Sequence, residues 1–449
     1  METFFIEVAL TTSLIHYQIF NFGGELQLMK SLSFIAILPA LFCQSVIAQP
    51  NQSEAIWQTI DVEKQLTVTD NEGEPITIEP ACAFDTIPGT QIDNSFQFYF
   101  KQGKKDKLVV YFNGGGACWN DATCVTSLVK GDRPTYNPTV HAANSPIDAG
   151  GIFDDKNDDN PFKEWSKVFI PYCSGDLHLG SSDVTYHDID GSLTGYPDTS
   201  IEVKHHGSDN FRAVKEWLKE RYTNDDGKME KLEKLSVIGS SAGGYGAIFN
   251  FSHLQELFPK TNASLLADAS NSIITQSFIN AEFEEGGNWN LEQTLPTFIT
   301  EDFGSYTNAT FNADIFSKLS AIYPESRFAQ YTTAFDVVQV QFLKIMTSLD
   351  LGVLDPELWA LTAADFGLFG YWNEQMNLSL ESLEESTDNY QYYIGEGTVH
   401  TILTDAFATG PEHHPFYDES SAEGVLFTDW LDSFVNDKKF KADSLNYIN

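Results

Sequence analysis

The sequence predicts an α/β fold with a mostly parallel central sheet, helices on both faces and lid-like insertions. Two observations predict it. Short apolar runs such as Leu108–Phe112 and Leu235–Ile238 alternate with stretches of helical period, which is typical of a parallel sheet covered on both faces. The glycine-rich and polar residues that stand out follow directly after such runs, where these sheets place their sites.

The elements can be assigned in chain order. Strands are expected at residues 76–78, 95–100, 107–112, 165–172, 235–238, 263–267, 328–335 and 390–394. The first two alternate polar and apolar residues and are interpreted as outer strands. Residues 210–222 have apolar side chains on one helical face, and a second helix is expected to begin at Tyr245.

Composition excludes several classes of protein. The chain of 449 residues has a formal net charge of −38, which disfavours binding to nucleic acid and to anionic membranes. Hydrophobic residues make up 42% of the sequence, which excludes a disordered chain. We therefore expect a folded domain with an acidic surface and no nucleic-acid partner. Nothing in the composition indicates an oligomeric state.

The N-terminal segment has the pattern of an export signal. Lys30 precedes an apolar run, and Val46 and Ala48 stand at the −3 and −1 positions of a cleavage site. The run is shorter than the roughly 20 residues of a spanning helix, although a membrane anchor is the alternative. We interpret residues 1–28 as an over-extended gene start, 29–48 as a signal peptide and 49–449 as one secreted or periplasmic domain, with no membrane span in the mature chain.

Four cysteines remain after this segment is removed: Cys82, Cys118, Cys124 and Cys173. An even number in an exported protein predicts disulfides, and four cysteines allow three pairings. Pairing Cys118 with Cys124 closes a short loop, and pairing Cys82 with Cys173 a long one. Buried free thiols are the alternative. The spacings typical of zinc sites are missing, so no metal is expected.

The segment Gly239–Gly244 carries the most specific signal. It reads Gly-Ser-Ser-Ala-Gly-Gly and lies between an expected strand and an expected helix. A G-x-S-x-G in this context is the nucleophile elbow of α/β-hydrolases, with Ser241 as the nucleophile. The glycines permit a tight turn that exposes the hydroxyl to a base. The alternative is a small-residue turn without chemistry.

The base of such a hydrolase follows the serine and the acid along the chain. His400 lies in a glycine-containing loop after the last expected strand and is the favoured base. His253 lies on the helix that leaves the elbow and is interpreted as structural. His413 and His414 precede a proline in a polar loop and are interpreted as a surface pair.

Two aspartates compete as the acid that orients His400. Asp336 follows the second strand after the elbow, which is the usual position, and it is favoured. Asp268 ends the strand directly after the elbow and is interpreted as a brace of the loop above it. Oxyanion donors are expected from the Gly114–Gly116 run together with the N–H of Ala242.

Together these segments resemble the pectin acetylesterases and the related Notum-type carboxylesterases, most closely the bacterial branch. The resemblance rests on residues 114–119, 172–176, 239–244, 267–269, 335–339 and 397–400. It implies Ser241 as nucleophile, Asp336 as acid and His400 as base, and it places Gly115 and Gly116 in the oxyanion hole with Ala242. We expect no cofactor. Ser240 stands where plant and animal members usually have cysteine, and Trp119 follows Cys118 rather than preceding it, so the substrate stays open.

Other residues have two interpretations. Two interpretations apply to Trp119, Asp176 and His178: they contact substrate, or they stabilise the fold. For Asp176 a structural role in a turn is favoured. Residues 154–160 are acidic but lack the spacing of an EF-hand, so a solvated loop is favoured over a calcium site. The aromatic stretches 273–325 and 359–372 form either a lid with an acyl or sugar pocket, or buried core.

The sequence as a whole predicts an exported serine carboxylesterase that acts through an acyl-enzyme. The leading substrate is an O-acetyl ester on a polysaccharide such as pectin. The charge of −38 opposes a polyanionic substrate at low salt, so short-chain and lipid-like acyl esters are alternatives. A secreted binding protein on the same fold, without catalysis, is the alternative from another class.

Overall fold

The structure is a computed structural model that describes residues 56–70, 73–85, 94–129, 135–140, 144–147, 149–404, 415–436 and 444–446. The expected gene start (1–28), the expected signal peptide (29–48) and the pair His413 and His414 lie outside the described residues. Residues Glu54–Asn449 form one unit by their contacts, and everything below concerns this unit.

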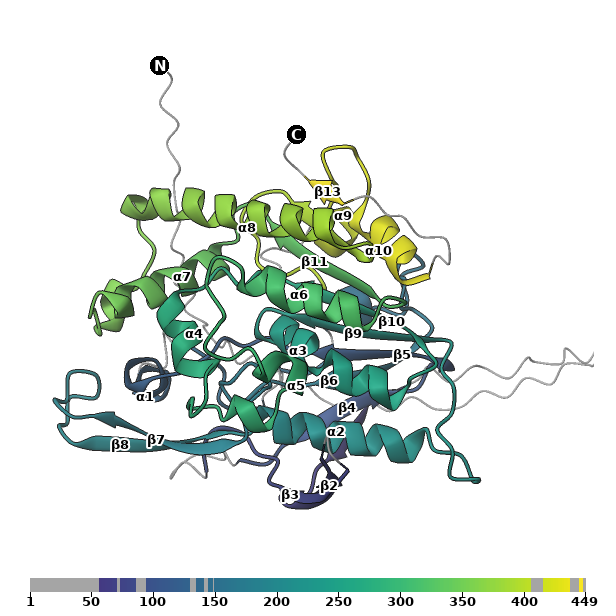
Figure 1. Cartoon of the computed structure of the whole chain (residues 1–449), viewed down its shortest axis with the longest axis horizontal. Helices are drawn as coiled ribbons and strands as arrows, with labels where there is room; N and C mark the ends of the chain where they lie inside the picture. Colours follow the sequence, from purple (N-terminus) through teal and green to yellow (C-terminus); the bar gives the residue numbers. More distant parts are fainter. Residues whose placement is uncertain are drawn as a thin grey trace, which may run out of the picture. The chain divides into compact units, whose positions relative to one another are not determined.

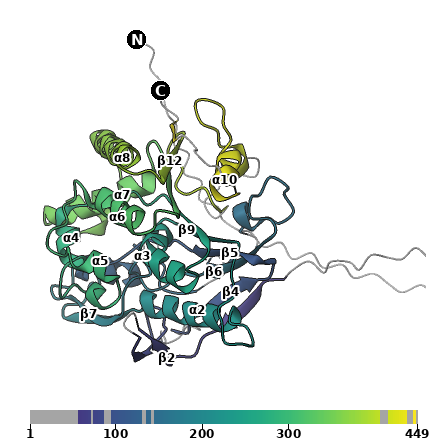
Figure 2. The same cartoon turned by 45° about the vertical axis from the view of Figure 1, so that its right-hand side comes forward.

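A single large sheet organises this unit (Figures 1 and 2). Within the described residues it has nine strands in the order β1-β4-β6-β5-β9-β10-β11-β12-β13. Their bounds are β1 Gln58–Asp61, β4 Gln97–Lys101, β6 Trp165–Ile170, β5 Lys104–Phe112, β9 Lys234–Ser240, β10 Asn262–Asp268, β11 Arg327–Thr333, β12 Tyr390–Gly395 and β13 Leu445–Asn446.

From β6 to β13 every neighbouring pair is parallel, whereas β1, β4 and β6 pair antiparallel. The expected mostly parallel sheet is therefore confirmed.

Helices cover both faces of the sheet, as expected. Along β5, Leu108, Val110 and Phe112 pack into the core of one face, which includes α2 and α3. Val109 and Tyr111, which alternate with them, pack into the core of the other face with α9 and α10. Figure 2 shows α3 and α10 on opposite sides of the strands. The period-two alternation of a strand thus divides its apolar side chains between two helical layers.

The helices within the described residues have the following bounds: α1 Asp121–Val129, α2 Gly207–Arg221, α3 Ala242–Leu257, α4 Gln276–Glu282, α5 Thr297–Thr300, α6 Phe311–Ile322, α7 Val337–Asp350, α8 Phe366–Ser386, α9 Pro415–Asp418 and α10 Phe427–Asn436. None of them has both the length and the apolar character needed to cross a bilayer.

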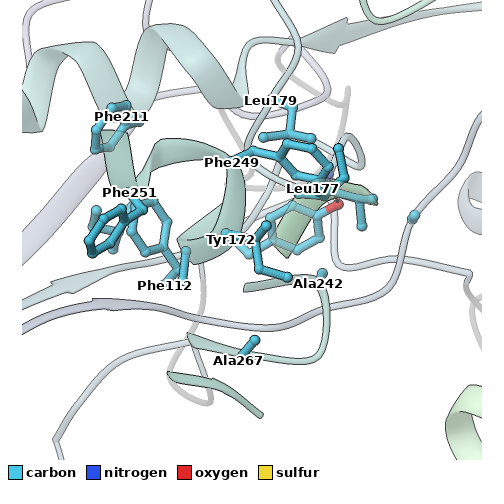
Figure 3. Packing of buried hydrophobic residues seen from close by; sticks show 14 of the residues in the cluster. Phe112, Tyr172, Leu177, Leu179, Phe211, Ala242, Phe249, Phe251 and Ala267 are labelled. Carbon is cyan, nitrogen blue, oxygen red and sulfur yellow. Dashed lines mark hydrogen bonds between the residues drawn. The ribbon is translucent and has the colours of Figure 1, made fainter. Parts of the chain in front are cut away.

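Figure 3 shows the aromatic packing behind the elbow. Phe112 ends β5, and its ring lies 5.6 Å from that of Phe211 on α2. Phe249 and Phe251 of α3 belong to the same core, as does Ala242 at the start of this helix. The start of α3 is therefore anchored in a packed layer.

Several expected elements need correction. Residues 75–78 (β3, Pro75–Ile78) do not join the central sheet but pair with β2 (Leu66–Thr69) in a sheet of their own. The strand expected at 390–394 is not the last strand of the sheet, because β13 pairs with it. The strand at 165 ends at Ile170, because Pro171 has no N–H for the ladder. The strand at 328 ends at Thr333, because Asp336 already caps α7.

An antiparallel hairpin of β7 (Ser182–Asp188) and β8 (Thr199–His205) extends beside α1 at the lower left of Figure 1. The N–H of His187 donates to the carboxylate of Asp121 on α1 at 2.8 Å. The expected disulfides are confirmed as Cys82–Cys173 and Cys118–Cys124.

Candidate active site

The elbow forms where β9 ends and α3 begins. Ser241, the residue between them, has φ 57° and ψ −126°, a conformation that non-glycine residues rarely adopt. A Cβ on Gly239 would lie 2.0 Å from the carbonyl oxygen of Gly243, and one on Gly243 would lie 2.0 Å from that of Phe112. The flanking glycines are therefore required by close backbone approach, and the turn has the strained form of a nucleophile elbow.

The end of β10 holds the elbow in place. The N–H of Ser241 donates to the carbonyl oxygen of Asp268 at 2.7 Å. The hydroxyl of Ser270 donates to the carbonyl oxygen of Ser241 at 2.6 Å. The backbone N–H of Ser241 is thus bonded to the last residue of β10 and its carbonyl oxygen to the segment just after this strand, which stabilises the unusual dihedral angles.

His400 is bonded to Asp336. Its Nδ1 lies 2.9 Å from Oδ1 and 2.8 Å from Oδ2 of this carboxylate, and both side chains are buried. Asp336 also caps α7 and accepts the N–H groups of Val338 (3.0 Å) and Gln339 (2.9 Å). A carboxylate at Nδ1 favours the imidazole tautomer that keeps Nε2 basic. Of the two aspartates considered from the sequence, Asp336 is the one hydrogen-bonded to His400.

Asp268 has a different set of partners. Its fully buried carboxylate accepts the hydroxyl of Ser240 at 2.7 Å and the N–H groups of Ile402 and Leu403. Burial raises the pKa of this carboxyl to about 6, against the opposing effect of these hydrogen bonds. The carboxylate therefore joins the elbow to the segment after His400.

The glycine run lies against the elbow. A Cβ on Gly114 would lie 2.9 Å from the Cβ of Ser241. Gly116 has φ +81° and pairs with Tyr136 in an isolated bridge. The hydrogen bonds of this bridge are made by the residues on either side of Gly116, as in the bond from the N–H of Ala117 to the carbonyl oxygen of Thr135. The N–H of Gly116 therefore takes no part in the bridge.

Ala242 is the first residue of α3. Its N–H therefore has no acceptor within the helix, because the first N–H groups of a helix have no carbonyl one turn before them.

A hollow of about 700 Å³, partly open to solvent, lies beside Ser241 and His400. Its walls include Gly116, Ala117 and Ala242 from the expected oxyanion region, but Gly115 is not among the described lining residues. The side chains around it are almost all apolar or aromatic. Five come from the first insertion (Ile273, Ile274, Phe278, Phe283 and Phe311), Trp372 comes from the second, and Val338, Phe342 and Met346 belong to α7. The lining also includes Trp119, Leu177 and Tyr245.

The sequence does not show which aromatic residues of the two insertions line this hollow. Trp372 lines it, whereas Trp359 is buried elsewhere and donates to the carbonyl oxygen of Val353. Leu177 and Tyr245 were not singled out from the sequence. Tyr245 follows the elbow by one helical turn, and that spacing is the signal that would have found it.

Asp176 and His178 have internal partners. The buried carboxylate of Asp176 accepts the Ser174 hydroxyl and the N–H groups of His178, Gly180 and Gly207. Burial raises its pKa to about 6 and lowers that of His178 to about 4, so this imidazole is neutral.

Trp119 lines the hollow and contacts Phe278 edge-on. On α3, burial lowers the pKa of His253 to about 3.

Among the described residues, one group of side chains is spaced closely enough to hold a metal ion, but each of its members already has a bonding partner. Cys118 and Cys124 lie near His205, but their sulfurs form a disulfide. The imidazole of His205 is bonded to the Tyr186 hydroxyl and the Ser174 carbonyl. In the acidic segment 154–160, Asp155 pairs with Lys101 and Lys167.

The fold and this arrangement define an α/β-hydrolase with a serine elbow and a histidine–aspartate pair at one hollow. The family model described as Pectinacetylesterase matches residues 92–360, more than half of the chain. The chain belongs to the pectinacetylesterase family.

Individual curated relatives match shorter parts of the chain and at low identity. The palmitoleoyl-protein carboxylesterase NOTUM of Schmidtea mediterranea is 26% identical over 157 residues, which cover 34% of this chain and 25% of that protein. Pectin acetylesterase 11 of Arabidopsis thaliana is 24% identical over 183 residues, covering 40% of this chain and 38% of that protein. The matches thus span less than two fifths of either relative. Both are named as esterases.

Among solved structures, the Wnt deacylase Notum from Drosophila is 16% identical and gives a TM-score of 0.48, with 79% of this chain and 92% of that chain covered.

Proposed function

We propose that this protein is a serine carboxylesterase that cleaves O-acyl esters through an acyl-enzyme on Ser241, with His400 as general base and Asp336 as its orienting acid. The observation that carries the proposal is the 2.8 Å contact of His400 Nδ1 with Asp336 at a hollow lined by both Ser241 and His400. A nucleophile, a base and an acid that orients the base are the three parts of serine hydrolysis.

The reaction follows from these roles. His400 Nε2 takes the hydroxyl proton as Ser241 Oγ bonds to the ester carbon. The carbonyl oxygen becomes an oxyanion, and the N–H groups of Gly116 and Ala242 are the proposed donors to it. Collapse breaks the bond to the alcohol, which leaves with the proton from His400. A water then gives a proton to His400 and attacks the acyl-enzyme. When this second intermediate collapses, the bond to Ser241 Oγ breaks, His400 returns its proton to this oxygen, and the carboxylic acid is released.

The lining of the hollow favours an apolar acyl group longer than acetyl. Phe278, Phe342, Met346 and Trp372 offer apolar contact well beyond what two carbons can use. Each buried methylene contributes about 0.8 kcal/mol, which corresponds to roughly fourfold in kcat/KM. Acetyl esters of pectin-like polysaccharide are the second candidate, because the chain belongs to the pectinacetylesterase family.

Export is part of the proposal. Disulfides persist in oxidising compartments, and the two here link Cys82 to Cys173 and Cys118 to Cys124. They agree with the signal-peptide pattern of residues 29–48, which we propose as the export signal.

Two measurements test this proposal. A fluorophosphonate probe should label the wild type and not Ser241→Ala, and a wild type that stays unlabelled contradicts the serine mechanism. Turnover of p-nitrophenyl esters from acetate to dodecanoate, beside acetylated pectin and xylan at low and high salt, then tests the acyl group. We expect kcat/KM to rise about fifteenfold per added pair of carbons until the hollow is filled, at roughly fourfold per methylene. A preference for acetylated pectin at any salt concentration would select the second candidate.

A further inference from the structure

Asp268 joins the two segments that carry the proposed nucleophile and base. It ends β10, and its carboxylate accepts the hydroxyl of Ser240, the residue directly before Ser241, at 2.7 Å. The same carboxylate accepts the N–H of Ile402 at 3.0–3.1 Å and that of Leu403 at 3.1 Å. These two residues follow His400 after a single intervening position. One buried group therefore spans the elbow and the base loop.

The backbone around Asp268 strengthens this connection. Its carbonyl oxygen accepts the N–H of Ser241 at 2.7 Å, so it holds the elbow through both backbone and side chain. Thr401, between His400 and Ile402, has φ 55°, a conformation that persists in a non-glycine residue only when its neighbours enforce it. The hydrogen bonds of Ile402 and Leu403 to Asp268 provide that constraint.

We propose that Asp268 is a positioning residue: its ionised carboxylate fixes His400 relative to Ser241, and its protonation in mildly acidic solution releases the His400 loop and stops turnover. This inference rests on the proposed serine mechanism. It is distinct from the role of Asp336, which contacts the imidazole itself.

The donors explain why the ionised form is needed. The carboxylate accepts from one O–H and two N–H groups. A protonated carboxyl would direct its own O–H either toward an N–H group, which cannot accept it, or toward Ser240 Oγ, which could then no longer donate to Asp268. At least one of these hydrogen bonds would then be lost. The titratable groups that face Asp268 are Tyr111 of β5, Tyr331 of β11 and His400. Burial raises the pKa of both phenols, so both stay neutral in acid.

The direction of the pH effect follows. Burial raises the pKa of Asp268 to about 6, so the carboxylate is ionised above that pH and becomes protonated as the pH falls through it. Because this pKa is above that of an unfolded aspartate, protonation of Asp268 does not favour unfolding. Turnover should therefore be lost in acid while the fold survives.

The pH dependence of kcat/KM tests the proposal. If activity requires an ionised Asp268, protonation of this carboxylate adds about one to the limiting slope of log kcat/KM per pH unit in acid. Asp268→Asn, which cannot titrate at this position, should lose that added slope and turn over at least about tenfold more slowly at pH 8. Ser240→Ala removes one hydrogen bond to the carboxylate of Asp268. The pH at which kcat/KM falls in acid should therefore rise by about 0.7 unit.

Asp176→Asn is the matched control. Asp176 is equally buried, accepts a serine hydroxyl and three backbone N–H groups, and also has its pKa raised to about 6, but its hydrogen bonds reach neither the elbow nor the His400 loop. It should keep the wild-type slope. Circular dichroism at each pH checks folding.

The outcomes separate the two proposals. Absence of fluorophosphonate labelling of the wild type overturns the serine mechanism itself. Labelling of the wild type, together with a folded Asp268→Asn that keeps its slope and rate, overturns the positioning role. If Asp268→Asn does not fold, an acid limb that is unmoved in Ser240→Ala overturns it.

Discussion

Replacement of Asp336 by asparagine should inactivate the enzyme without unfolding it, because of how this carboxylate divides its hydrogen bonds. Oδ1 accepts the backbone N–H groups of Val338 and Gln339 and lies 2.9 Å from His400 Nδ1, whereas Oδ2 accepts the side-chain amide of Gln339 and lies 2.8 Å from the same nitrogen. In the asparagine variant the amide oxygen should remain at the Oδ1 position, where two backbone donors need it. The NH₂ group then faces His400.

That NH₂ group changes the tautomer of the imidazole. The nearer neighbour of Nδ1 is now an N–H donor, from which Nδ1 should accept a hydrogen bond. The proton then moves to Nε2, and the nitrogen that should remove the Ser241 proton is no longer basic. A wrong tautomer with intact geometry costs about 10⁴-fold in kcat, or about 5.5 kcal/mol of transition-state stabilisation. Asparagine caps a helix as well as aspartate does, so α7 should remain folded.

The assay is kcat on the best p-nitrophenyl ester at pH 8, with circular dichroism as the test of folding. Asp355→Asn is the control, since Asp355 caps a short helix in the same way but does not line the hollow. It should retain wild-type turnover. A folded Asp336→Asn with turnover within tenfold of the wild type would refute the reasoning.

Two further predictions concern stability and the acyl group. The loops closed by Cys82–Cys173 and Cys118–Cys124 have sequence separations of 91 and 6, so loss of the first bridge by double alanine substitution should cost about 4.6 kcal/mol and loss of the second about 2.2 kcal/mol. Urea unfolding measures both, and an equal or reversed order would contradict the loop-closure argument. Met346→Trp should fill part of the hollow and lower kcat/KM for dodecanoate more than tenfold, with little effect on acetate, and equal effects on both esters would place the acyl chain elsewhere.

The strained turn at Ser241 and the pairing of Asp336 with His400 could be predicted from the sequence because their signals are local. A Cβ added to Gly239 or Gly243 would lie 2.0 Å from a carbonyl oxygen, so only glycine fits at either position, and the two glycines mark the serine between them. Asp336 was found by its position after a strand, although that strand ends at Thr333 and the aspartate belongs to the helix cap instead.

Other features depend on contacts between distant parts of the chain and could not be predicted. The bond from Ile402 to Asp268 joins residues 134 positions apart, so only the folded chain reveals it. Trp359 and Trp372 lie in the same aromatic stretch, yet only the second lines the hollow. The hairpin β7–β8 was missed because its polar, half-exposed strands have no apolar run that indicates a buried strand.

The central claim, an acyl-enzyme on Ser241, is tested most directly by intact-mass measurement. The protein is mixed with excess p-nitrophenyl ester, quenched in acid within the burst phase, and weighed before and after proteolysis. The account predicts a mass increase of one acyl group on the peptide that contains Ser241, and none in Ser241→Ala. Turnover of the ester with an unmodified wild-type peptide, or an adduct that persists in Ser241→Ala, would contradict it.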